Sequence, residues 1–288
     1  MKVLVAGAGG MLGRDVAAAC RARGHDVAGL VHAELDITDP RSVETALGSV
    51  RPDVVINCAA FTAVDAAEEA EPEAMRVNDT GAALLAAAAA SHDAKFVFIS
   101  SDYVFDGTKR RPYVESDLTA AASAYGRTKQ AGETSVAVAN PSHLIVRSSW
   151  LFGTGGGNFV ETMLRVGSEQ SEVVVVSDQV GCPTYTPHLA EGIALLAEGE
   201  DYGIHHLAGS GSCSWYEFAQ EIFDLAGVEC DVLAGTTEML ARPAPRPAYS
   251  VLGSERDDPI VLPHWKQGLG EYLAERSASG AAAAGGAA

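Results

Sequence analysis

The stretch Lys2-Val3-Leu4-Val5-Ala6-Gly7-Ala8-Gly9-Gly10-Met11-Leu12-Gly13 opens the chain and decides its fold. Its apolar beginning, residues 2–6, predicts a buried parallel β-strand. Residues 14–23 then predict a helix that stops at Gly24. A strand, a glycine turn and a helix in this order form the context in which a glycine motif binds a dinucleotide.

The glycine spacing has a physical purpose at such a site. One glycine makes the tight turn, another lets the backbone approach a pyrophosphate, and a third packs the helix on the strand. The helix N-terminus adds free N–H groups and the positive end of its dipole. A glycine loop without a ligand is the alternative, but a position one strand from the N-terminus favours a cofactor. We expect binding by Gly7, Gly10, Met11, Leu12 and Gly13.

The segment after the second predicted strand, residues 26–30, bears on the choice of cofactor. An acidic residue at this point would bind a free ribose 2′-hydroxyl, and an arginine would favour a 2′-phosphate. The sequence Val31-His32-Ala33 provides neither. We therefore expect NADPH, with NADH also accepted, His32 as the candidate at the 2′ position, and Asp36 and Ile37 at the adenine edge.

Strands and helices alternate through the first half of the chain, which predicts an α/β fold with a doubly wound parallel sheet of the Rossmann type. The glycine-rich run 153–157 follows Trp150 and marks the start of a smaller C-terminal substrate lobe. The predicted parts are a dinucleotide-binding domain at 1–149, which 185–208 rejoins through a strand at 204–207, a substrate lobe at 150–184 and 209–276, and a disordered Ala/Gly/Ser tail at 277–288.

Charge and cysteine content exclude several classes of function. The net charge is −18, with a pI near 4.7, which argues against nucleic acid and anionic membranes as partners. The 5 cysteines are scattered without a C-x-x-C pair, so neither a disulfide framework nor a zinc site is predicted. With no signal-like or membrane-length apolar run, the sequence predicts a cytoplasmic protein.

Three side chains suggest carbonyl chemistry. Tyr125 and Lys129 are four residues apart, so on a helix they share one face. A lysine ammonium beside a phenol would lower the phenol's pKa and help it to exchange a proton with a carbonyl oxygen. Ser101 ends a predicted strand, where ligand sites of open α/β sheets gather. A surface pair for Tyr125 and Lys129, and a strand-end cap for Ser101, are the structural alternatives.

Several longer segments carry a family resemblance. They are residues 7–13, 57–65 (Asn-Cys-Ala-Ala-Phe-Thr-Ala-Val-Asp), 100–107 (Ser-Ser-Asp-Tyr-Val-Phe-Asp-Gly), 125–129, 147–153 (Arg-Ser-Ser-Trp-Leu-Phe-Gly), 178–184 (Asp-Gln-Val-Gly-Cys-Pro-Thr) and 246–250 (Arg-Pro-Ala-Tyr-Ser). In these segments the chain resembles the extended short-chain dehydrogenase/reductases and, among them, the dTDP-4-dehydrorhamnose reductases.

The resemblance implies roles for individual residues. Ser101, Tyr125 and Lys129 would form the catalytic triad, with Ser101 replacing a common threonine. The cofactor would also contact Ala59, Ala60, Tyr125 and Lys129, and the substrate would contact Thr62, Val64, Asp102, Tyr103, Trp150, Gln179 and Arg246. Some family members form homodimers that bind magnesium through interface carboxylates. A homodimer is compatible with this chain, and no metal site is assigned.

The same comparison separates related chemistries. Dehydratases of the superfamily carry an Asp-Glu pair after the catalytic hydroxyl residue, whereas Ser101 is followed by Asp102 and Tyr103. The resemblance therefore implies NAD(P)H-dependent reduction of the 4-keto group of a dTDP-4-keto-6-deoxyhexose, in deoxysugar biosynthesis. A nucleotide-sugar 4-epimerase and a non-catalytic, cofactor-binding regulatory subunit remain as alternatives, and the sequence does not identify the sugar.

Overall fold

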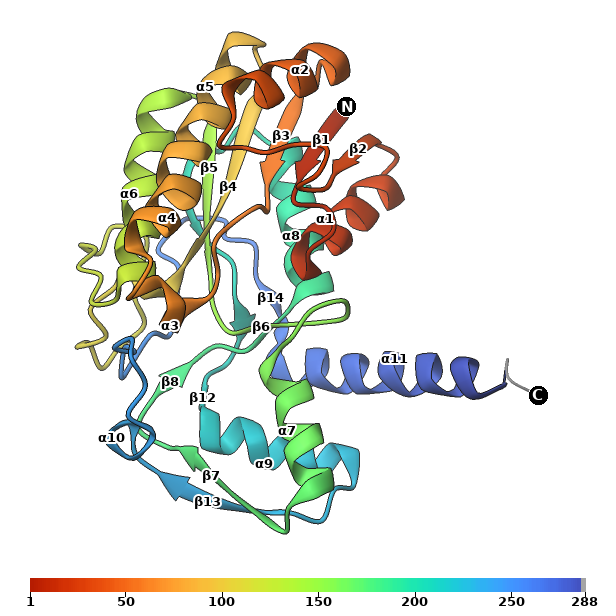
Figure 1. The fold of residues 1–288 in the computed structure, drawn as a ribbon, viewed down its shortest axis with the longest axis vertical. Helices are drawn as coiled ribbons and strands as arrows, with labels where there is room; N and C mark the ends of the chain where they lie inside the picture. Colours follow the sequence, from red (N-terminus) through yellow and green to blue (C-terminus); the bar gives the residue numbers. More distant parts are fainter. Residues whose placement is uncertain (286–288) are drawn as a thin grey trace.

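A six-stranded parallel sheet forms the centre of the larger part of the molecule (Figure 1). The computed structural model describes the backbone of residues 1–285 and the side chains of residues 1–278. The strand order is β10-β5-β4-β3-β1-β2. The strands are β1 (Lys2–Ala6), β2 (Asp26–Leu30), β3 (Val54–Asn57), β4 (Lys95–Ser101), β5 (His143–Ser148) and β10 (Gly203–His206). The predicted α/β fold with a Rossmann-type parallel sheet is confirmed.

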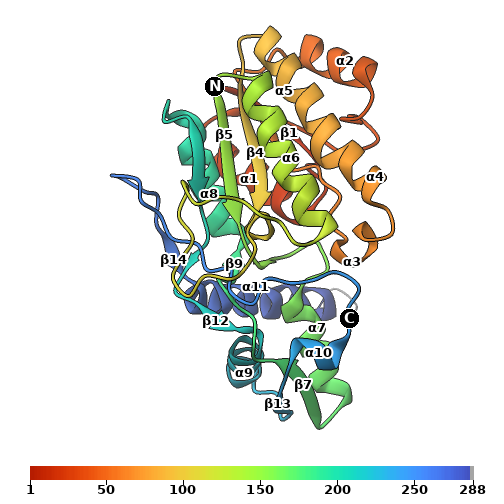
Figure 2. The ribbon, with the colours of Figure 1, turned by 90° about the vertical axis from the view of Figure 1, so that its left-hand side faces the viewer.

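Helices cover both faces of this sheet (Figures 1 and 2). One core packs beneath α1 (Met11–Ala22) and α8 (Thr186–Glu198), and it includes Val3 and Val5 of β1. The other core includes Leu4 and Ala6. Side chains alternate between the two faces of a strand, and both faces are buried here, so β1 has to be apolar throughout. Helices α2 (Pro40–Val50), α5 (Ala82–Ser91) and α6 (Ala124–Ala139) contribute buried side chains to this second core. The other elements of this part are α3 (Val64–Ala67), α4 (Glu71–Met75), η1 (Arg76–Gly81) and η2 (Asp102–Val104).

The chain leaves the sheet after β5, enters a smaller lobe and returns. The outward segment comprises β6 (Leu151–Phe152), α7 (Phe159–Glu169), β7 (Glu172–Val176), β8 (Val180–Gly181) and β9 (Thr184–Tyr185). Helix α8 then packs against α1, and β10 pairs with β5 at the edge of the large sheet. The chain therefore passes twice between the large sheet and the smaller lobe, once after β5 and once on its return through α8 and β10.

The smaller lobe is held together by aromatic side chains. Its core contains Phe152, Tyr185, Phe218, Trp265 and Tyr272, which gives a lobe with only two-stranded sheets a large apolar contact area. The remaining elements are β11 (Gly209–Ser210), β12 (Cys213–Ser214), α9 (Trp215–Ala226), β13 (Asp231–Gly235), α10 (Thr237–Leu240), β14 (Leu262–His264) and α11 (Trp265–Gly285).

Helix α11 differs from the sequence prediction at the C-terminus. Disorder was predicted from residue 277, but α11 continues to Gly285 and projects away from the body of the molecule (Figure 1). Alanine has the highest helix propensity, so an alanine-rich segment can extend a helix that packing has already started. Residues 286–288 of the predicted tail lie outside the described residues.

Candidate active site

The start of α6 brings the predicted catalytic tyrosine to the end of β4. The Ser123 hydroxyl caps the helix by accepting a hydrogen bond from the Gly126 N–H at 3.1 Å. A Cβ on Gly126 would lie 2.2 Å from the carbonyl oxygen of Tyr103. Glycine at this position therefore allows α6 to approach η2, which follows β4 directly.

This approach places two tyrosines together. The rings of Tyr103 and Tyr125 lie edge to face, with their centroids 5.8 Å apart. Burial raises the pKa of Tyr125 to about 12, the Asp102 carboxylate adds to the rise, and a hydrogen bond with Ser101 opposes it. In this ligand-free arrangement Tyr125 is therefore protonated at neutral pH, which is the state from which a phenol can donate to a carbonyl oxygen.

Lys129 lies one turn further along α6 and is only 2% exposed. Its Nζ stands over the ring of Phe98, 4.2 Å from the centroid. Burial lowers the pKa of Lys129 to about 7, while Glu133 and Cys58 oppose this shift. The sequence prediction that an ammonium would lower the pKa of Tyr125 is therefore wrong for the ligand-free protein, because burial raises the pKa of Tyr125 and lowers that of Lys129.

A buried ion pair lies on the same helix, one turn beyond Lys129. The Glu133 carboxylate accepts hydrogen bonds from Arg147 Nε at 2.9 Å and Nη2 at 2.7 Å, and one from the Ser100 hydroxyl at 2.5 Å. These contacts tie α6 to β4 and β5. Glu133 was not predicted from the sequence, although an acid four residues after the predicted catalytic lysine is a visible signal on a helix.

Ser101 makes different contacts from those expected. Its hydroxyl donates to Asp102 Oδ1 at 2.9 Å and accepts from the Tyr103 N–H at 3.1 Å. The single hydroxyl proton therefore points to Asp102 and not into a substrate site. Asp102 itself is 1% exposed, and burial raises its pKa to about 6 against hydrogen bonds from Ser250 and Ser101.

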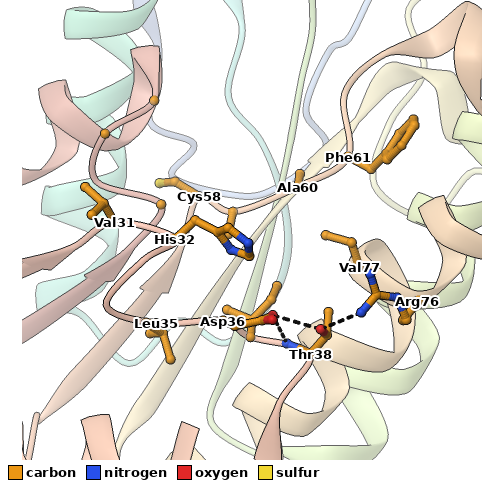
Figure 3. A pocket seen from close by; sticks show the side chains of 15 residues that line it. Val31, His32, Leu35, Asp36, Thr38, Cys58, Ala60, Phe61, Arg76 and Val77 are labelled. Carbon is orange, nitrogen blue, oxygen red and sulfur yellow. Dashed lines mark hydrogen bonds between the residues drawn. The ribbon is translucent and has the colours of Figure 1, made fainter. Parts of the chain in front are cut away.

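A cavity of about 500 Å³ lies above the glycine turn (Figure 3). Gly7 has a φ of +75°, and a Cβ there would lie 2.7 Å from the Ala59 nitrogen, so the turn needs glycine to pack against the segment that follows β3. The cavity is lined by seven of the predicted cofactor residues, Gly7, Gly10, His32, Asp36, Ile37, Ala59 and Ala60. Its size and its glycine floor fit the adenosine and pyrophosphate of a dinucleotide.

Five predicted cofactor residues are not part of this lining, namely Met11, Leu12, Gly13, Tyr125 and Lys129. Met11, Leu12 and Gly13 form the first turn of α1. A Cβ on Gly13 would lie 2.2 Å from the Gly7 carbonyl oxygen. The last glycine therefore serves the packing of the helix on the turn, the third of the roles that the motif requires.

Arg76 in the wall of the cavity was missed by the sequence analysis. Its Nη1 donates to the Thr38 hydroxyl at 2.8 Å, and Thr38 donates in turn to the Asp36 carboxylate at 2.8 Å (Figure 3). The hydrogen bonds from the Thr38 N–H and hydroxyl lower the pKa of Asp36, and burial of this carboxylate opposes them only weakly. From the sequence, an arginine for the 2′-phosphate was expected only at the end of β2, whereas Arg76 comes from η1.

A second cavity, of about 610 Å³, lies against the smaller lobe. Three predicted substrate residues, Tyr103, Gln179 and Arg246, line it together with Trp215 of α9. Four others do not line it, namely Thr62, Val64, Asp102 and Trp150. Trp150 instead stacks on Trp215, with ring centroids 3.5 Å apart. It therefore packs against a side chain that lines the cavity without lining it itself.

Arg246 is engaged within the protein. Its guanidinium donates to both Asp65 carboxylate oxygens, at 2.5 and 2.8 Å, and to the Ala244 carbonyl oxygen at 2.7 Å. The hydrogen bond from Arg246 lowers the pKa of Asp65 to about 2. Arg242 lies near the same carboxylate but is more exposed. A phosphate ligand would therefore have to share Arg246 with Asp65.

Residues 1–278 contain neither a metal-binding cluster nor a membrane-spanning helix. No cluster of three or more His, Cys, Asp or Glu side chains there is arranged to hold a metal ion. Within the described part of the chain, no helix has the length and apolarity needed to span a membrane. The cysteines are all free thiols.

The fold and the site define an oxidoreductase of the short-chain dehydrogenase/reductase class, with a dinucleotide cavity beside a Ser-Tyr-Lys cluster. The family model described as RmlD substrate binding domain matches residues 1–278, and the chain belongs to this family.

Individual relatives narrow the comparison. A dTDP-4-dehydrorhamnose reductase of Streptomyces griseus is 43% identical, over 93% of this chain and 91% of the relative. A dTDP-4-keto-6-deoxy-D-glucose reductase of Streptomyces niveus is 41% identical, over 92% and 94%. The crystal structure of a dTDP-4-dehydrorhamnose reductase of Bacillus anthracis in complex with NADP has a TM-score of 0.92 and 38% identity, and it covers 95% of this chain and 99% of that one.

Proposed function

We propose that the protein uses NADPH to reduce the 4-keto group of a dTDP-4-keto-6-deoxyhexose. The observation that carries this proposal is the contact between Tyr125 and Tyr103. Tyr103 lines the cavity of the smaller lobe, and its ring meets that of Tyr125 at 5.8 Å. Lys129, one turn further along α6, lies near Cys58, which lines the dinucleotide cavity. We therefore place the proposed acid at the junction of the two cavities, although its own side chain lines neither of them.

The cofactor would be held by backbone contacts along the glycine turn and by side chains around its adenosine. Gly7 and Gly10 would admit the pyrophosphate, and Ile37 and Asp36 would face the adenine. Bound there, the cofactor supplies a hydride to the substrate carbon. The relative with NADP in its crystal structure supports NADPH in this role, and NADH remains a second donor to be measured.

The residues of this chain would supply the proton and the orientation. Tyr125 would donate its phenol proton to the oxygen at C4, where negative charge develops as the carbonyl is reduced. Lys129 would hold Tyr125 and the ribose in place, with its Nζ over the Phe98 ring at 4.2 Å from the centroid. Ser101 would orient the Tyr125 hydroxyl.

The substrate would enter through the second cavity. Trp215 and Tyr103 offer aromatic surfaces for a base and a sugar ring, and Arg246 offers a guanidinium for a diphosphate. The two relatives from Streptomyces have nearly equal identity to this chain and are named for different 4-keto sugars. Overall similarity therefore does not select one sugar.

A panel of dTDP-4-keto sugars tests the proposal, with loss of NADPH absorbance as the readout. We expect stoichiometric oxidation of NADPH with at least one 4-keto-6-deoxyhexose and none with the corresponding 4-hydroxy sugars. A nucleotide-sugar 4-epimerase would instead interconvert 4-hydroxy sugars without consuming NADPH and would purify with tightly bound nicotinamide. A regulatory subunit would bind NADPH without oxidising it, and either result would overturn the proposal.

A further inference from the structure

The geometry points to Asp65 as a positioning residue that orients the Arg246 guanidinium toward the diphosphate of the nucleotide sugar. This inference deepens the proposed function and rests on its substrate, a dTDP-sugar. Asp65 belongs to α3, whereas Arg246 follows α10 and lines the second cavity. Asp65 does not line that cavity itself, so it acts through Arg246.

Asp65 holds both the backbone and the side chain of the segment that carries Arg246. Its Oδ1 accepts from the Ala244 N–H at 3.1 Å and from Arg246 Nη1 at 2.5 Å, and its Oδ2 accepts from Nη2 at 2.8 Å. Nη1 also donates to the Ala244 carbonyl oxygen at 2.7 Å. The carboxylate, the Ala244 backbone and the guanidinium therefore form a closed set of four hydrogen bonds.

The chain beyond Arg246 is fixed at a second point. Gly107 has a φ of +76°, and a Cβ there would lie 2.4 Å from the Pro247 Cβ, so the two segments are in close contact. The Tyr249 N–H donates to the Gly107 carbonyl oxygen at 3.2 Å. The backbone of Arg246 is thus held from both sides, and the contacts with Asp65 determine which way its side chain faces.

The hydrogen bonds within the protein leave one edge of the guanidinium for a ligand. Of its five N–H donors, which lie in one plane, Asp65 and Ala244 take three. The carboxylate occupies the edge between Nη1 and Nη2, and the Ala244 oxygen takes the second hydrogen of Nη1. One hydrogen on Nε and one on Nη2 remain, side by side on another edge. Two such parallel N–H groups match two oxygens of one phosphate.

The charges around Arg246 preserve this arrangement at neutral pH. The hydrogen bond from Arg246 lowers the pKa of Asp65 to about 2, so the carboxylate is ionised. Tyr103 also faces Arg246 from the cavity wall, and burial raises the pKa of its phenol, so Tyr103 is uncharged. Asp65 therefore fixes the plane of the guanidinium at any pH used for an assay.

A competing role for Asp65 predicts the opposite change in affinity. A carboxylate that only competes with the diphosphate for Arg246 would lower dTDP affinity, and its removal should tighten binding. A carboxylate that positions Arg246 spares the ligand the cost of ordering a long side chain, and its removal should weaken binding. The Asp65 side chain is 38% exposed and uses a different edge of the guanidinium, so water screens its repulsion of the phosphates. Positioning should therefore outweigh repulsion.

Asp65→Asn tests the inference by titration with dTDP, without turnover. The amide keeps one acceptor, but its NH2 group would face guanidinium donors, so the paired contact is lost. We expect dTDP affinity to fall by about 3- to 10-fold, the cost of ordering one long side chain. KM for the 4-keto sugar should rise by the same factor at unchanged kcat. NADPH affinity should not change.

Glu69→Gln is the matched control, because Glu69 is exposed and lies four residues further along, and the same charge is removed. We expect its dTDP affinity to equal that of wild type. Arg246→Lys keeps the cation but cannot form the planar pair, so it should weaken dTDP about as much as Asp65→Asn does. Asp65→Asn added to Arg246→Ala should cause no further loss, since Asp65 acts through Arg246.

Four results would overturn the inference. They are unchanged or tighter dTDP binding by Asp65→Asn, equal weakening by Glu69→Gln, equal weakening of NADPH, and a further loss in the double variant. Absence of dTDP binding by wild type would overturn it as well. The proposed function fails separately if wild type binds dTDP but oxidises no NADPH with any 4-keto sugar. Weaker dTDP binding by Asp65→Asn would then still support the role of Asp65 in holding a diphosphate.

Discussion

The two cavities of this protein are built in opposite ways. The dinucleotide cavity takes its floor from one local turn, and glycine backbone does most of the shaping. The second cavity takes its walls from β7, α7, α9 and the loop after α10, which are separated by many residues in the chain. A local motif can be recognised without the fold, whereas a wall of distant side chains exists only after folding. We place the proposed acid, Tyr125, at the junction between them, because its ring contacts Tyr103 of the second cavity.

This difference predicts that substitutions on either side should affect one ligand only. A change in the dinucleotide cavity should alter cofactor affinity and leave dTDP binding intact, and a change in the second cavity should do the reverse. A change at the junction should alter neither affinity but reduce turnover. Three substitutions test these cases, and they are argued here from the largest expected effect to the smallest.

Tyr125→Phe should have the largest effect. The ring and its edge-to-face contact with Tyr103 are kept, and only the hydroxyl, the proposed proton donor, is lost. We expect turnover to fall by roughly 100-fold or more, measured by NADPH oxidation at saturating substrate. The dissociation constants for NADPH and dTDP, from fluorescence or calorimetric titration, should stay within a few-fold of wild type.

Tyr103→Phe is the matched control for that substitution. Tyr103 contacts the same ring but is not the proposed acid, so its turnover should fall much less. Turnover of Tyr125→Phe within a few-fold of wild type would remove Tyr125 from the chemistry, and the junction would then have no identified acid.

Arg246→Ala should have an intermediate effect, confined to the nucleotide sugar. Losing a charge-assisted contact to the diphosphate would cost about 1.5–3 kcal/mol, or roughly 10- to 150-fold in KM. The Asp65 carboxylate occupies the guanidinium in the ligand-free protein, so we expect the lower part of this range. The measurement is titration with dTDP beside titration with NADPH, whose affinity should not change.

Arg242→Ala provides the control, since Arg242 lies by the same carboxylate but its side chain is 58% exposed. An exposed charge contributes little, so its effect should stay below about 5-fold. Equal dTDP affinity in wild type and Arg246→Ala would move the phosphate contact elsewhere and leave Arg246 as a structural partner of Asp65.

The sequence predicted the first cavity better than the second for a physical reason. Gly7, Asp36 and Ala59 follow the ends of parallel strands, and parallel strand ends meet at one edge of the sheet. Thr62 and Val64 were assigned to the substrate by resemblance, yet they do not line the second cavity in the ligand-free protein. Trp215, which does, lies on a helix whose packing no local pattern revealed.

The pKa values show the same limit of sequence reasoning. Spacing alone placed Lys129 beside Tyr125, and the helix confirms that spacing. What spacing could not give was the depth of burial, which lowers the pKa of Lys129 to about 7 and raises that of Tyr125 to about 12. Desolvation depends on everything packed around a group, so its sign and size appear only with the tertiary structure.

The smallest effect is expected for the choice between NADPH and NADH. No arginine or acid ends β2, and His32 is exposed at the cavity mouth. We expect the specificity constants of the two cofactors to differ by less than ~100-fold, equivalent to ~2.7 kcal/mol. His32→Ala should reduce any preference for NADPH by no more than about 5-fold, the effect of an exposed charge contact.

Arg76→Ala sharpens this test, because Arg76 donates to Thr38 on the Asp36 side of the cavity (Figure 3). That side is assigned to the adenine, which both cofactors share. Arg76→Ala should therefore weaken NADPH and NADH by the same factor, whereas His32→Ala should weaken NADPH alone, with both affinities measured by titration of the free protein. If Arg76→Ala instead removed most of an NADPH preference, a guanidinium from η1 would be the group that reads the 2′-phosphate. The dinucleotide cavity would then also depend on a residue distant in sequence, and the contrast between the two cavities would be one of degree.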